Sequence, residues 1–481
     1  MAALLLGGAM APVFAADVKN LSVTVSSGTQ ANAYGGYTIE EGASALQNAL
    51  TLSGPAKVLG ASAGGWSRWG NAEWNTLTIR LDEDGLLGPS DIVGGGVAES
   101  EGGGAAVHNT VYIESGTVEG TVEGGVAVGI NGVGDGTGDV LSNQVTMSGG
   151  TVYSVFGGET GEGNANDNVV TIKGSAAVTG KSNAVYGGYT IDGNASGNIV
   201  NIEDDADIHG EIMGGYTRAG SLISGNKVNV TGGNVNENTV YGVYTAYGDV
   251  LDNQAVIKGT GQAGSSDTNS VYAGFTNIGA AAGNILYIQD SAEIAGSAFA
   301  GYQGGFISSE TVERNQVFMS GGSVNGDLTG GGSNNGGETL NNYVEITGGT
   351  VSGNVYSGFT DSADALENTL TVAGGRVEGS LFGGYSNTGT ANENKLTFSA
   401  GTAGSDAYGG YAQEGADKNE AVLSGTSVLE GNAAGGSSAR GEASGNSLTI
   451  KENSEVKGDA AGGDVYMGTI SKNIITIQYN A

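Results

Sequence analysis

Residues 185–202 read VYGGYTIDGNASGNIVNI, and this stretch decides the fold. It closes on Asn198 followed by alternating positions, so Asn198, Val200 and Ile202 fall on one face of an extended strand. The segment is short, carries β-branched residues and is surrounded by Gly, which favours a strand over a helix. If Val200 and Ile202 point into a core, Asn198 points there too.

The Asn segment recurs along nearly the whole chain. Its copies begin at Asn48, Asn75, Asn109, Asn143, Asn168, Asn198, Asn226, Asn253, Asn284, Asn315, Asn342, Asn368, Asn394, Asn419, Asn446 and Asn473. Asn20 begins a shifted first copy. The steps average about 28 residues, and a period of about 20–50 residues indicates stacked supersecondary units.

We therefore predict an all-β fold: a single long parallel β-helix (β-solenoid) of about 17 coils of roughly 28 residues across residues 16–481. One unit of short strands cannot bury an apolar face alone, whereas stacked units can. Leucine-rich repeats would need L-x-x-L-x-L runs, and propeller blades would need four strands in about 40 residues. Collagen is excluded because the 92 Gly have no three-residue period and only 3 Pro occur.

Two sets of side chains recur at one register. The Asn set is expected to stack along the axis and to satisfy its own hydrogen bonds, a structural column that includes Asn168, Asn198, Asn226, Asn284, Asn315, Asn342, Asn368 and Asn394. The second set comes from the aromatic-Gly-Gly-aromatic element. It comprises Trp66, Tyr189, Tyr216, Tyr244, Phe275, Tyr302, Phe359, Tyr385 and Tyr411. Pointing inward, these aromatics are core; pointing outward, they form a stripe of contact residues.

Charge restricts the partners. The chain has 17 Lys and Arg against 50 Asp and Glu, a net charge of −33. Nucleic-acid affinity depends on Lys and Arg that replace counterions, so we expect no nucleic-acid partner. An anionic membrane surface would be repelled for the same reason.

The sequence offers little for catalysis or metal binding. It has no Cys and only two His, His108 and His209, which lie more than three coils apart. We expect no enzyme, and no catalytic, metal-binding or cofactor-binding residues. Residues 129–139 resemble one calcium-binding nonapeptide, but such sites form between successive copies. Residues 82–85 begin like an EF-hand loop, yet Leu86 occupies the fifth position.

Both ends of the chain carry signals. Residues 1–15 are apolar, too short for a transmembrane helix, and end on Val13-Phe14-Ala15, a pattern typical of signal-peptidase cleavage. No Lys or Arg precedes Lys19, so we interpret 1–15 as an incomplete signal peptide. The chain ends just after the Asn473 segment, which predicts an array truncated at its C-terminus.

The repeating unit resembles the glycine-rich repeats of autotransporter (type V secretion) passenger domains. The resemblance rests on Asn-x-Val-x-Ile, Gly-Gly-x-Val-x-Gly and Val-Tyr-Gly-Gly-Tyr, and it covers about residues 20–481. It implies a parallel β-helix that is exported and displayed on the outer membrane of a Gram-negative cell, or released, often as an adhesin. The family's C-terminal membrane barrel is missing here, so any link to the outer membrane would depend on that barrel. No catalytic residue is carried over.

Three classes of function remain. We expect first a surface-displayed or secreted adhesin or self-association rod, whose partners are host-cell or matrix surface molecules or other copies of itself. A purely structural stalk or surface-layer scaffold is the alternative. A polysaccharide-active β-helix enzyme is the third, and long insertions on neighbouring coils would favour it. The widest steps flank Asn109.

Overall fold

The computed structural model describes residues 17–88, 92–99, 103–129, 135–182, 184–236, 238–264, 271–305, 309–334 and 336–478. The predicted signal peptide, 1–15, lies outside these residues. The described part is all-β, with no α-helix, and its strands stack in parallel as a β-solenoid. It divides into two compact units, unit 1 (1–238) and unit 2 (239–481), which are described separately.

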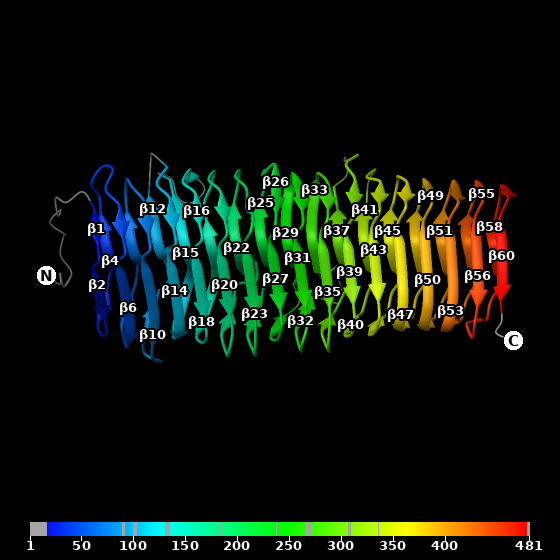
Figure 1. The fold of residues 1–481 in the computed structure, drawn as a ribbon. Coiled ribbons are helices and arrows are strands. Elements are labelled where there is room, and N and C mark those ends of the chain that lie inside the picture. The colour runs from blue at the N-terminus through cyan, green and yellow to red at the C-terminus, as the bar shows by residue number, and fades with distance from the viewer. Residues whose placement is uncertain are drawn as a thin grey trace. The chain divides into compact units, whose positions relative to one another are not determined.

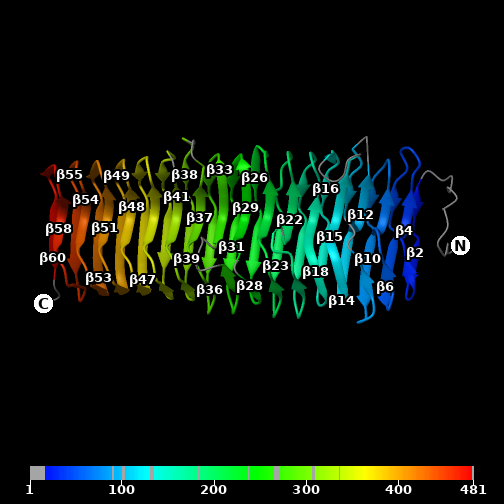
Figure 2. The same ribbon diagram turned by 180° about the vertical axis from the view of Figure 1, so that it is seen from behind.

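The described residues form about 16 turns rather than the predicted 17. A turn runs from one Asn segment to the next. The seventeen segments, counting the one after Asn20, therefore enclose sixteen turns. Within each unit the strands lie side by side in parallel rows (Figures 1 and 2).

Each turn contains one strand that follows a repeated Asn, called the Asn strand. In unit 1 the Asn strands, with the shifted first copy, are β2 (Ser22–Val25), β6 (Ala49–Gly54), β10 (Thr76–Leu81), β14 (Thr110–Ser115), β17 (Gln144–Met147), β20 (Val169–Ile172), β23 (Ile199–Ile202) and β27 (Lys227–Val230). In unit 2 they are β31 (Gln254–Ile257), β35 (Ile285–Ile288), β39 (Gln316–Met319), β43 (Tyr343–Ile346), β47 (Thr369–Val377), β50 (Lys395–Ala403), β53 (Glu420–Leu429), β56 (Ser447–Lys451) and β60 (Ile474–Gln478).

Each full turn also contains one strand built on the Gly-Gly element, or on a copy in which one of the two Gly is replaced, called the GG strand. In unit 1 the GG strands are β4 (Ala33–Thr38), β8 (Ser62–Ser67), β12 (Val93–Glu99), β15 (Thr117–Val128), β18 (Thr151–Glu159), β22 (Val185–Thr190) and β25 (Ile212–Thr217). In unit 2 they are β29 (Val240–Tyr247), β33 (Val271–Ile278), β37 (Ala298–Gln303), β41 (Leu328–Ser333), β45 (Val355–Thr360), β48 (Leu381–Ser386), β51 (Ala407–Ala412), β54 (Ala433–Ser438) and β58 (Ala460–Val465). Shorter strands, such as β24 (Asp207–Ile208), complete each turn.

The core lies inside each turn and is built by alternation. Val170 of β20 is in register with Val200 of β23, and Ile172 with Ile202. Val200 and Ile202 are fully buried, whereas Asn201 between them is partly exposed. The predicted register of this strand is therefore what the structure has.

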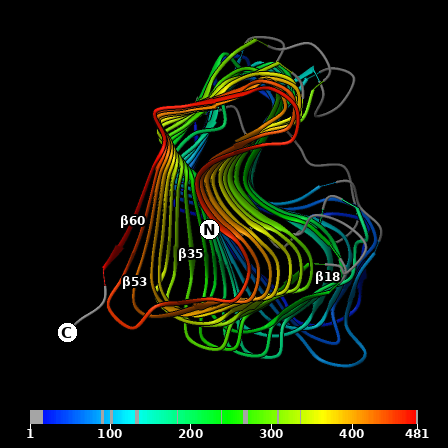
Figure 3. The same ribbon diagram turned by 90° about the vertical axis from the view of Figure 1, so that its right-hand side faces the viewer.

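The GG strand approaches the Asn strand closely. A Cβ added at Gly188 would collide with the side chain of Asn198, and one at Gly384 with Asn394. At these two positions only Gly fits such a close approach. Figure 3, viewed along the stacked turns, shows the outline of a turn indented on the side away from β35, β53 and β60.

A left-handed corner precedes each Asn strand, a feature that the sequence analysis missed. The residue before the repeated Asn has φ between 53° and 58° at Gln47, Trp74, His108, Ser142, Asp167, Asp252, Arg314, Asn341, Glu367, Glu393, Lys418 and Lys472. Gly occupies this corner at Gly197, Gly225, Gly283 and Gly445. Asn20 itself occupies the corner of the first turn, with φ 57°, which explains why its copy is shifted by one residue.

Candidate functional site

The structure places the repeated Asn residues inside the turns. Asn168, Asn198, Asn226, Asn284, Asn315, Asn342, Asn368 and Asn394 are all at most 1% exposed. At Asn315, Nδ2 donates to the carbonyl of Ala281 at 2.8 Å and to Oδ1 of Asn342 at 3.0 Å. Its own Oδ1 accepts from the backbone N and from Nδ2 of Asn284. The hydrogen-bonding capacity of this side chain is used within the protein, so it has none left for a ligand.

The aromatic residues lie on the opposite face of the GG strand from the core. In β22, Val185 and Thr190 are fully buried, and Thr190 Oγ1 donates inward to the carbonyl of Gly163. Tyr189 points the other way and is partly exposed. The same partial exposure occurs at Tyr216, Tyr244, Phe275, Phe359, Tyr385 and Tyr411, whereas Trp66 and Tyr302 are buried.

The aromatic that precedes the two Gly of each element forms a second column. This column runs beside the one formed by the aromatic that follows the two Gly. Tyr186 stands in register with Phe156 and Met213, and its ring packs edge-on against Tyr189 at 5.5 Å between centroids. In unit 2 the second column includes Tyr241, Tyr272, Phe299, Tyr356, Phe382 and Tyr408. The sequence analysis selected only the second aromatic of the element, although both stood in the same motif. We call the two columns together the aromatic face.

Stacking of the rings along the turns covers the ring faces. Tyr189 and Tyr216 stack at 4.8 Å with an interplanar angle of 7°. In unit 2, Tyr385 stacks on Phe359 at 5.5 Å and on Tyr411 at 5.3 Å, both at 11°. The aromatic face therefore offers ring edges and hydroxyl groups rather than ring faces to a partner.

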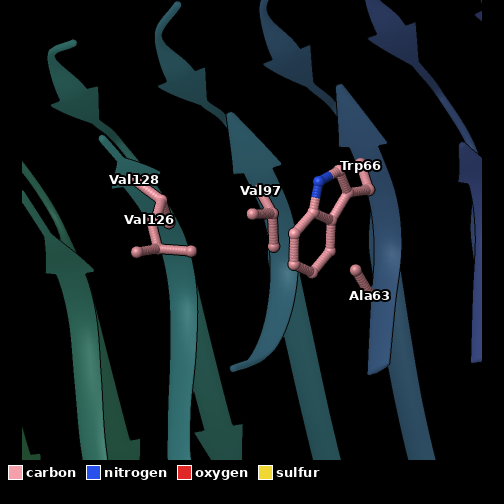
Figure 4. Packing of buried hydrophobic residues seen from close by; sticks show 5 residues of the cluster. All are labelled: Ala63, Trp66, Val97, Val126 and Val128. Carbon is pink, nitrogen blue, oxygen red and sulfur yellow. The ribbon is translucent and has the colours of Figure 1, made fainter. Parts of the chain in front are cut away.

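In unit 1 aliphatic and acidic residues interrupt the aromatic face. Trp66 of β8 is followed in register by Val97 of β12, Val126 of β15 and Glu159 of β18. Figure 4 shows Trp66, Val97 and Val126 side by side on neighbouring strands. The Trp66 Nε1 donates to Glu99 Oε2 at 3.2 Å.

A pair of carboxyl groups lies at this interruption. Glu123 of β15 is 1% exposed and stands in register with Phe156, while Glu159 stands in register with Tyr189. The two side chains are hydrogen-bonded to each other. Burial raises the pKa of Glu159 to about 7, and the hydrogen bond with Glu123 acts in the opposite direction. The sequence analysis missed this pair, although both Glu residues stand at positions that carry an aromatic in other turns.

In unit 2 carboxylates flank the tyrosines of the aromatic face. The hydroxyl of Tyr408 donates to Asp406 Oδ2 at 3.1 Å, and Asp464 interacts with the same ring. Asp327 lies near Tyr356, and Asp361 near Tyr385. Desolvation is the main cause that raises the pKa of each of the three tyrosines. The carboxylate comes second at Tyr356 and Tyr408 and follows Tyr411 at Tyr385, and all three hydroxyls stay protonated. The ion pairs of the described part of unit 2 involve other carboxylates, which leaves these four as uncompensated negative charge.

The candidates for metal binding and catalysis are scattered. His108 stacks on Trp74 at 4.2 Å, and His209 Nε2 lies 2.9 Å from Asp207 Oδ2 on the surface. Asp82 accepts from the backbone N of Asp84, forming a local turn. Part of the nonapeptide-like segment, residues 130–134, lies outside the described residues. Among the residues described, no group of three or more His, Asp or Glu side chains is arranged to hold a metal ion.

No helix among the described residues is both long enough and apolar enough to span a membrane. Comparisons of the chain with known protein families, with characterised proteins and with solved structures give no match.

Proposed function

We propose that the chain is a surface-displayed or secreted β-helical passenger of the autotransporter type, acting as an adhesin or self-association rod. The observation that supports this proposal is the aromatic face, which repeats partly exposed aromatic rings, most of them tyrosines, at one register in each unit. Repeated identical contacts on a rigid scaffold produce avidity without a deep pocket. The resemblance of the repeats to autotransporter passengers supports export to the surface of a Gram-negative cell.

The electrostatics favour a cationic partner. Asp327, Asp361, Asp406 and Asp464 lie beside the tyrosines of unit 2, and the whole chain carries −33. Stacking leaves few ring faces for sugars, which bind best to exposed faces. Lys- or Arg-rich segments of host-cell or matrix proteins match the hydroxyl groups and carboxylates better. A second copy of this acidic chain is a weaker candidate for the same reason.

The alternative is a purely structural stalk or surface-layer scaffold. Ring stacking supports it, because stacked pairs hold neighbouring turns together whether or not a partner binds. A polysaccharide-active enzyme is the weakest proposal. The two catalytic carboxyl groups of a glycosidase lie about 5 Å or more apart. Those of Glu123 and Glu159 are hydrogen-bonded to each other, which is too close for that arrangement.

A comparison of tyrosine variants separates adhesion from a purely structural role. Changing Tyr385, Tyr408 and Tyr411 to Phe keeps the rings and their stacking but removes three hydroxyls. Binding of the purified protein to immobilised host-cell and matrix proteins should fall about tenfold or more, since each lost hydrogen bond costs roughly 1 kcal/mol. The melting temperature should change little.

The control changes Tyr287 and Tyr343 to Phe on β35 and β43. These two rings lie with Phe318 in a separate outward ladder on the Asn strands. The control should bind like the wild type. Unchanged binding by both variants would leave the structural scaffold as the better proposal.

A further inference from the structure

The carboxyl pair connects two neighbouring GG strands on their outer side. Glu123 of β15 stands where β18 has Phe156, and Glu159 of β18 stands where β15 has Val126. One turn on, the same two positions hold Phe156 and Tyr189, whose ring centroids lie 5.7 Å apart. The two carboxyl groups meet in the same diagonal way across the pairing of β15 with β18. Glu123 is almost completely buried, and Glu159 is partly exposed.

The hydrogen bond between them requires a proton. Two ionised carboxylates are acceptors only and repel each other, so a hydrogen bond forms only when one of the two is protonated. The protonated carboxyl then donates to the other, and the pair carries a single negative charge. Loss of that proton to water would leave two adjacent carboxylates and no hydrogen bond.

Positive charge to stabilise two carboxylates is missing from the described strands around the pair. Arg218, which follows β25, acts on Tyr189 rather than on Glu159. The sequence contains no Lys or Arg between Arg80 and Lys173. The described strands that pack against β15 and β18 contain no Lys, Arg or His. The titratable groups on β15, β18 and these strands, besides the pair, are Glu99, Glu114, Glu119, Tyr112, Tyr153, Tyr186 and Tyr189.

None of those groups can supply the positive charge that a second carboxylate would need. Tyr186 and Tyr189 interact electrostatically with Glu159 and are neutral at physiological pH. Glu99 accepts a hydrogen bond from Trp66, and Glu114 forms an ion pair with Arg80. Glu119 is exposed and adds negative charge.

We propose that Glu123 and Glu159 form a proton-held clasp between β15 and β18, which loosens this part of unit 1 as the solution changes from acidic to neutral. The partly exposed Glu159 is the side chain that swings towards water when the proton is lost. Glu123 then remains as a buried carboxylate, and the local pairing of the two strands weakens. The clasp is a regulatory device of unit 1, and it does not depend on the proposed adhesive function.

The direction of the effect follows from the raised pKa of Glu159. In the open state its pKa returns to about 4.5, so between about pH 5 and pH 7 the closed state holds more protons than the open state. The opening equilibrium therefore rises by up to about tenfold per pH unit across this window and levels off above it.

Hydrogen exchange followed by mass spectrometry on the full chain tests the clasp. Protection factors, corrected for the intrinsic pH dependence of exchange, are compared at pH 5, 6, 7 and 8. Peptides from β15 and β18 should lose protection between pH 5 and pH 7, whereas peptides from β45 and β48 in unit 2 should not. A flat profile at β15 and β18 would overturn the proposal.

Neutral variants identify the groups responsible. The double variant Glu123→Gln/Glu159→Gln keeps a hydrogen-bonding pair but cannot titrate, so its β15 and β18 protection should be independent of pH. The single variant Glu159→Gln provides the same test should the double variant fold poorly. Glu345→Gln is the matched control on β43 and should retain the wild-type profile. Wild-type pH dependence in Glu159→Gln would contradict the clasp.

A bound cation is the competing explanation, and calcium distinguishes it. Millimolar calcium should leave the protection of β15 and β18 at pH 8 unchanged. Restoration of the pH 5 protection by calcium at pH 8 would show that the pair is a cation site and would overturn the proposal. Infrared spectra should also show a protonated carboxyl at pH 6 that Glu123→Gln/Glu159→Gln lacks.

Discussion

Oδ1 of Asn226 accepts two hydrogen bonds from Asn198, one from its backbone N and one from its Nδ2, each at 3.0 Å. The second hydrogen of Asn198 Nδ2 goes to the carbonyl of Ala165 in the preceding turn, at 2.8 Å. One side chain thus connects three successive turns at the corner where the GG strand approaches. This relationship repeats along each unit and explains why Asn recurs at this corner.

Replacing one Asn of the column should be costly. Asn342→Asp removes two donors and places a carboxylate against Oδ1 of Asn368, in a site that is 1% exposed. We expect a loss of about 3 kcal/mol or more in the free energy of unfolding. The neighbouring Asn341→Asp, at an exposed corner, should cost less than about 1 kcal/mol. Similar losses in urea denaturation of the two variants would contradict the assigned role of the column.

The register of β23 provides a second test. Val200→Asp or Ile202→Asp would bury an unpaired charge among fully buried side chains and should cost several kcal/mol, on the order of 3–5. Asn201→Asp should change the stability little. Its side chain is partly exposed, and an Asp there still accepts from Nδ2 of Asn229. Equal damage at positions 200 and 201 in thermal denaturation would refute the register.

The left-handed corners predict a stabilising substitution. Glu367 has φ 54° and is exposed, and a non-Gly residue in this region costs about 1–2 kcal/mol. Glu367→Gly removes that strain but adds freedom to the unfolded chain, so we expect a net gain of about 0.5–1 kcal/mol. The reciprocal Gly445→Ala, at φ 67°, should lose a similar amount. A lower melting temperature for Glu367→Gly would contradict this account of the corner.

Alkaline pH should unfold the chain through its tyrosines. Burial is the main reason that the pKa of Tyr34, Tyr189 and Tyr302 is raised to about 12. These hydroxyls ionise near pH 10 in the unfolded chain, so the unfolded state loses protons first and the stability falls as the pH rises from about 10 to 12. In a pH titration, tyrosinate absorbance should appear at higher pH in the native protein than in the protein unfolded by urea. Identical titration curves in the two states would show that the rings are not shielded.

Calcium should not be needed for folding. Circular dichroism and the melting temperature should be the same in EDTA and in millimolar calcium, because the described acidic residues do not group into a metal site. The control is the double variant Asp82→Asn/Asp84→Asn, at the turn that begins like an EF-hand, which should behave like the wild type. A large calcium-dependent rise in melting temperature that this variant abolishes would place a site there.

Much of the fold was determined by the sequence itself. The spacing of about 28 residues gave the stacked parallel turns, and the alternation after Asn198 gave the buried positions of Val200 and Ile202. Both follow from local periodicity: a strand exposes every second residue to one side, and identical units bury that side only by stacking. The count of turns differed by one because the repeated segments mark the borders between turns.

The tertiary structure alone decided which way the aromatics point and which side chains meet. Two consecutive Gly break the alternation of the GG strand. Counting every second residue from Val185 therefore cannot tell to which side of the strand Tyr189 points. The packing of Gly188 against Asn198 decides that side. The meeting of Glu123 with Glu159 was also invisible, because the two residues stand 36 positions apart and come together only through the register of β15 with β18. The left-handed corners escaped detection since residues as different as Trp74, Glu367 and Lys418 occupy them. At these corners the backbone hydrogen bonds of the stacked turns impose a conformation that these three side chains do not signal.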